Sequence, residues 1–71
     1  MKYVERNGHL VETWIVWYTI KGFEMPVIVK GTEPEVREYM ESEFGYMGRY
    51  HALTKKEESE LVKIGFDIYI A

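Results

Sequence analysis

The sequence predicts a small α+β domain in which a three-stranded antiparallel meander and a C-terminal strand pack against two helices, in the order β-β-β-α-α-β. A long stretch of aromatic and β-branched residues, 12–30, breaks only at Lys21-Gly22, as the two strands of a hairpin do. Two Thr-x-x-Glu sequences follow, each leading into apolar residues at helical spacing. Residues 66–70 then alternate between apolar and polar, which is typical of a strand with one buried side. With 71 residues, the chain 1–71 is expected to form one domain.

The first two strands are predicted on either side of Asn7-Gly8. Lys2 to Arg6 has the composition of a short strand, and Asn-Gly is a strong two-residue hairpin signal because both residues tolerate positive φ. We expect His9 to Ile20 to be the second and longest strand.

Two turn geometries are open for the hairpin at residues 12–30. A two-residue loop at Lys21-Gly22 pairs Ile20 with Phe23 and places Trp14 on the main apolar face and Trp17 on the other. A three-residue loop with a bulge exchanges the two tryptophans. In both registers one tryptophan lies opposite the main core. There it is covered by a helix or by a second chain; the alternative is that it forms part of a partner-binding patch. In the first register the main face contains Trp14, Val16, Tyr18, Ile20, Phe23, Met25, Val27 and Val29.

The first helix is predicted to start at a capping box. Thr32-Glu33-Pro34-Glu35 has the required spacing, with a proline in the first turn, and Gly45 is the expected end. The stripe expected to lie on the sheet is Val36, Tyr39, Met40 and Phe44.

The second helix is predicted from a similar signal. Thr54-Lys55-Lys56-Glu57 opens a helix that runs to Ile64, with Leu61 and Ile64 facing inward and Gly65 as the stop. The final strand is expected to bury one face and expose the other; its inward residues are Phe66, Ile68 and Ile70.

Negative charge is concentrated in one segment. Residues 32–44 carry five glutamates against one arginine, a balance of −4, whereas residues 1–31 sum to +1 and residues 45–71 to zero. Proteins that grip phosphate backbones usually have a basic stripe, so direct binding of nucleic acid is not expected. We interpret the acidic segment as the solvated face of a helix, the alternative being that it occupies a basic site on a partner.

A chain of this length buries a small core. There is no cysteine, so neither a disulfide nor a thiolate metal site can reinforce it, and dense aromatic packing or oligomerisation are the remaining routes. Without an apolar N-terminal segment or an apolar run of membrane length, the expected location is the cytoplasm, with no membrane association.

The segment 45–52 has a composition suited to binding. It is longer than a tight helix–helix turn requires, and it carries Tyr46, Arg49, Tyr50 and His51, residue types that contribute strongly at interfaces. The structural alternative is that its tyrosines close the end of the core. Together with the two strand tryptophans, the candidate binding residues are Trp14, Trp17, Tyr46, Arg49, Tyr50 and His51.

No motif for catalysis is present. The sequence contains no Ser/His/Asp order, HExxH, P-loop or GxGxxG, and its glutamates lack the loop of a calcium site, so we expect no enzyme activity, cofactor or metal. A compact, acidic, cysteine-free domain with an aromatic hairpin is similar in style to small phage or mobile-element proteins. The sequence therefore predicts a non-catalytic interaction module, an inhibitor or adaptor, whose partner is another protein or itself in a homodimer. The alternative is a homo-oligomer that binds a nucleotide or another anion in an interface pocket lined by Arg49, Tyr50 and His51.

Overall fold

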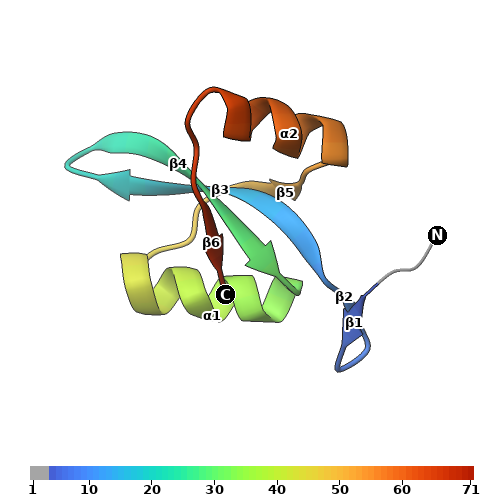
Figure 1. Ribbon diagram of the computed structural model, residues 1–71. Coiled ribbons are helices and arrows are strands. Elements are labelled where there is room, and N and C mark those ends of the chain that lie inside the picture. Colours follow the sequence, from blue (N-terminus) through green and yellow to red (C-terminus); the bar gives the residue numbers. More distant parts are fainter. Residues whose placement is uncertain (1–3) are drawn as a thin grey trace.

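The structure of the chain is a computed structural model that describes residues 4–71 (Figure 1). It is a small α+β domain in which a mixed sheet lies between two helices, so the predicted fold class is confirmed. In chain order the elements are β1 (Glu5–Arg6), β2 (His9–Leu10), β3 (Glu12–Ile20), β4 (Phe23–Gly31), α1 (Glu33–Phe44), β5 (Tyr50–Ala52), α2 (Lys55–Lys63) and β6 (Ile68–Ile70).

A four-stranded sheet in the order β5-β3-β4-β6 forms the centre of the domain. β3 pairs antiparallel with β4 and β5, whereas β6 runs parallel to β4. The long hairpin has the two-residue loop, because Ile20 pairs with Phe23. Lys21 (φ 50°) and Gly22 (φ 82°) both have positive φ, as in a type I′ turn. Trp17 is therefore the tryptophan on the face opposite the main core.

α1 covers the first face of this sheet and closes the main core. The capping box predicted at its start is present: Thr32 N donates to Glu35 Oε1 at 2.9 Å, and Glu35 N donates to Thr32 Oγ1 at 3.4 Å. The helix ends at Gly45, which has a φ of 71°. The buried cluster combines four hairpin residues with two from the helix: Trp14, Val16, Val27, Val29, Val36 and Met40.

α2 lies on the opposite side of the sheet from α1 (Figure 1). Thr13 Oγ1 donates to Glu58 Oε1 at 3.2 Å, and Ile28, which points to this side, is fully buried. The prediction that Ile64 faces inward is wrong, because its side chain is 73% exposed. Ile64 is the C-cap residue (φ −90°, ψ 5°), so the helical repeat that would align it with Leu61 stops before it.

The edges of the sheet are two three-residue strands. β5 lies inside the segment that was expected to be a loop, where it pairs with β3. β6 begins two residues later than predicted, and Ile70 is 68% exposed although it was expected to be inward. A strand at an edge has a neighbour on one side only, so alternation places Ile70 on the face of Ile68 without burying it.

The N-terminal part forms a separate two-stranded sheet. Instead of one strand from His9 to Ile20, the chain breaks at Val11: β2 pairs with β1, and β3 starts the central sheet. The predicted meander is thus divided into two hairpins. Arg6 Nη2 donates to Glu35 Oε1 at 2.8 Å, which connects the small sheet to α1. Lys2 and Tyr3 of the predicted first strand lie outside the described residues.

Candidate interaction surface

The β3–β4 hairpin is longer than the helix that covers it. Each strand has nine residues and spans about 30 Å, whereas the 12 residues of α1 span about 18 Å. The end of the hairpin consequently projects beyond both helices, as Figure 1 shows. The apolar pattern that builds the core continues along this uncovered part.

Three large apolar side chains lie exposed on the α1-side face of the hairpin end. Phe23 is 71% exposed, Ile20 51% and Met25 44%. Ile20 pairs directly with Phe23, and Met25 is two positions further along β4, so the three are neighbours on one face. We call these three residues the hairpin-end surface. Next to it, Tyr18 packs on Phe44 of α1 with ring centroids 4.6 Å apart, which connects the surface to the core.

The other face of the hairpin end carries Trp17 beneath an arginine. The Arg49 guanidinium carbon lies 4.1 Å from the Trp17 ring centroid, and Arg49 Nε donates to Glu24 Oε2 at 3.4 Å. The Arg49 and Glu24 side chains are 63% and 55% exposed, so their ion pair stabilises the fold little, whereas an exposed cation–π contact is worth about 0.5–1 kcal/mol. Among residues 4–71, Trp17 Nε1 is buried and has no hydrogen-bond partner.

The free edge of β4 is protected by Pro26. Trp17 N donates to Arg49 O at 2.9 Å, away from β4, so Trp17 and its partner Pro26 form a non-hydrogen-bonded pair. The Pro26 nitrogen therefore points to the outer edge, where its missing N–H costs no ladder bond and offers no donor to another strand. The β4 edge of the hairpin end is thus poorly suited to the addition of another strand.

Trp14 and Tyr50, two of the predicted binding residues, have structural roles on the α1 side. Trp14 is 8% exposed, its Nε1 donates to Gly31 O at 3.0 Å, and its ring centroid lies 5.7 Å from that of Tyr50. Tyr50 Oη donates to Glu33 Oε1 at 2.8 Å and accepts from Arg37 Nη2 at 2.9 Å. These bonds join β5 to the first turns of α1.

The predicted residues of the segment 45–52 do not gather at one place. Tyr46 is exposed, and His51 pairs with Ile15 and so lies on the α2 side. There, hydrogen bonding to Thr54 lowers the pKa of Glu57, and the nearby His51 has a smaller effect in the same direction. Tyr50, one position earlier in β5, points to the α1 side. Arg49, Tyr50 and His51 therefore do not line a common cavity within one chain.

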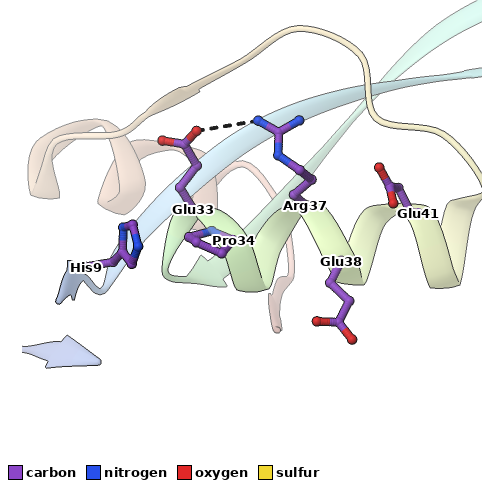
Figure 2. A pocket seen from close by; sticks show the side chains of 6 residues that line it. All are labelled: His9, Glu33, Pro34, Arg37, Glu38 and Glu41. Atoms are coloured by element: carbon purple, nitrogen blue, oxygen red, sulfur yellow. Dashed lines mark hydrogen bonds and ion pairs between the residues drawn. The ribbon is translucent and has the colours of Figure 1, made fainter. Parts of the chain in front are cut away.

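A depression of about 320 Å³ lies between β2 and α1 (Figure 2). In Figure 2 the carboxylate of Glu33 and the guanidinium of Arg37 point toward one another, 3.5 Å apart, while Glu38 points away from them. The depression is lined by His9, Glu33, Pro34, Arg37, Glu38 and Glu41.

Within residues 4–71, His, Asp and Glu side chains form no group of three or more that could hold a metal ion.

Comparison of the chain with known protein families, with curated proteins and with solved structures gives no match. No helix among the described residues is long and apolar enough to cross a membrane.

The apolar pattern of the sequence predicts that the hairpin-end surface belongs to the core, because Ile20, Phe23 and Met25 share a face with Val27 and Val29. A signal for their exposure was available in the predicted lengths. The helix predicted between Thr32 and Gly45 spans about 18 Å, which is too short to cover the strands predicted at His9–Ile20 and Phe23–Lys30 along their whole length.

Proposed function

We propose that this chain is a non-catalytic protein-interaction module, an inhibitor or adaptor, and that the hairpin-end surface is its main contact. The observation that carries the proposal is the exposure of three adjacent large apolar side chains at a projecting end of the molecule. Exposed apolar groups that gather in this way mark interaction sites more often than scattered ones do.

The size of this surface indicates that a partner contacts more than these three side chains. Full burial of one such side chain is worth about 1.5–3 kcal/mol, so the exposed parts of Ile20, Phe23 and Met25 together contribute roughly 2.5–5 kcal/mol. Association itself costs about 4 kcal/mol or more in lost translational and rotational freedom. Arg49, which lies on Trp17 at the opposite face of the same hairpin end, supplies a second contact surface. Arginine and tryptophan are among the residue types enriched at interface centres.

The test is site-specific photo-cross-linking in the cells that produce the protein. A photoreactive phenylalanine analogue replaces Phe23 in one variant and Ile64 in a control; the two native side chains are 71% and 73% exposed. We expect a discrete protein adduct from position 23 and none from position 64, identified by mass spectrometry. Adducts of equal yield from both positions, or no adduct from position 23, would show that the hairpin end is not a contact surface.

A further inference from the structure

We infer that the hairpin-end surface binds a second copy of this chain, so that two hairpin ends pack face to face about a two-fold axis. The inference rests on the proposed function, because it uses the same surface and names the partner. In a symmetric dimer of this kind each residue meets the same surface on the other copy.

Charge favours this surface over two others that the structure exposes. A surface that packs on the same surface of a second copy must not bring like charges together. Between Tyr18 and Met25, the α1-side face of the hairpin carries only apolar and aromatic side chains: Tyr18, Ile20, Phe23 and Met25. The three side chains of the hairpin-end surface can therefore pack on their own copy without bringing like charges of this face together, and the exposed Lys21 lies in the turn beside them.

Two other exposed surfaces do not have this property. The outer side of α1 carries Glu38, Glu41 and Glu43, which would repel their counterparts. The opposite face of the hairpin end would bring Arg49 toward the Arg49 of the other copy. Charge thus favours one of the three surfaces for self-association.

The small core supplies an independent argument for a second copy. Seven apolar residues in the described part of the chain are buried, and the sequence contains no cysteine that could form a disulfide. Domains of this size are marginally stable, and oligomerisation is one of the routes that add stability to them. Packing two hairpin ends together would extend the apolar layer of Tyr18 and Phe44 beyond the end of α1.

The available area predicts a weak dimer. The three side chains offer roughly 300 Å² per copy, or about 600 Å² in total, whereas stable complexes bury about 1,200–2,000 Å². We therefore expect reversible association with a dissociation constant in the high-micromolar range.

Sedimentation equilibrium from about 10 µM to about 1 mM tests the inference. The average mass of the wild type should rise from 8.5 kDa toward twice that value. Phe23→Ser should stay monomeric, and Ile64→Ser, which removes an equally exposed apolar side chain on the other side of the sheet, should associate like the wild type. Met25→Lys, which adds a charge to each copy, is a second variant that should stay monomeric.

A wild type that remains at 8.5 kDa overturns the dimer, and so does association that persists in both Phe23→Ser and Met25→Lys. The first of these results is separable from a failure of the proposed function. A monomeric wild type that still forms an adduct with another protein from position 23 overturns the dimer alone. A monomeric wild type without any adduct overturns both.

Discussion

Identical side chains, three positions apart on β3, have different environments. Trp14 is buried beneath α1 and donates to Gly31 O, while Trp17 lies on the other face beneath the exposed Arg49. The sequence predicted that one tryptophan would face away from the core, but it could not say which. The choice depended on whether the turn at Lys21-Gly22 has two residues or three, and both were compatible with a glycine at that position.

Val27 is the residue at which a buried charge tests the strand assignment most directly. It is 6% exposed and belongs to the cluster with Val16, Val29 and Met40. Val27→Asp would bury a carboxylate with no partner there, so we expect a loss of several kcal/mol and no cooperative unfolding by urea. Val62→Asp, at a half-exposed position on α2, is the control and should fold. A cooperative transition for Val27→Asp would contradict the position of β4 in the core.

Gly48 is required because the backbone of β3 comes close to it. Its N–H donates to Trp17 O at 2.7 Å, and a Cβ at this position would lie 2.7 Å from the same oxygen. Gly48→Ala should therefore move β5 away from β3 and lower the free energy of unfolding by about 1–3 kcal/mol, measured in urea. Ser59→Ala, an exposed change on α2, should have almost no effect. A Gly48→Ala variant as stable as the wild type would contradict this close approach.

At the scale of single elements, the sequence predicted most where local chemistry decides the structure. Both capping boxes, at Thr32 and Thr54, and the turn at Asn7-Gly8 formed as expected. β5 was missed because its three residues are held by pairing with β3, a long-range contact without local signal. The break at Val11 was missed for a related reason, since β2 and β3 differ only in which strand each one pairs with.

The two type I′ turns differ in their first residue, which allows a matched pair of variants. Asn7 (φ 52°) and Lys21 (φ 50°) have the same left-handed conformation, which asparagine adopts more readily than lysine. Lys21→Asn should raise the free energy of unfolding by about 0.5–1 kcal/mol, and Asn7→Lys should lower it by a similar amount. Thermal unfolding of both variants provides the measurement. A destabilised Lys21→Asn variant would mean that the Lys21 side chain makes a contact that outweighs its backbone strain.

The capping glutamates make the stability of both helices dependent on pH. Hydrogen bonding to Thr32 lowers the pKa of Glu35 from its ordinary value of 4.5, and Thr54 acts in the same way on Glu57. Because the folded pKa lies below the unfolded one, the stabilisation is present above pH 4.5 and is lost as the pH falls through the folded value. Urea unfolding of Glu35→Gln should therefore differ most from the wild type near neutral pH and converge with it in acid. Glu60→Gln on the outside of α2 is the control, and a difference that grows in acid would contradict the assignment.

At the scale of the whole molecule, the mismatch between a long hairpin and a short helix creates the candidate surface. The sequence predicted the strands and the helix, but the position of the helix along the strands depends on packing that no local pattern encodes. Residues that continue the core pattern were therefore assigned to the core, although Phe23 is 71% exposed. Of the predicted residues in the segment 45–52, Arg49 lies at the hairpin end on Trp17, while Tyr50 pairs with Val16 nearer the middle of β3 and is hydrogen-bonded to α1.

The concentration dependence of amide and methyl resonances in nuclear magnetic resonance spectra shows directly whether the hairpin-end surface packs on a second copy of the chain. On dilution from about 1 mM to about 10 µM, we expect shifts confined to residues 18–25 and to their contact at Phe44. Resonances of α2, including the equally exposed Ile64, should not move. Shifts centred on α2, or spectra that do not change with concentration, would show that the hairpin-end surface does not bind a second copy.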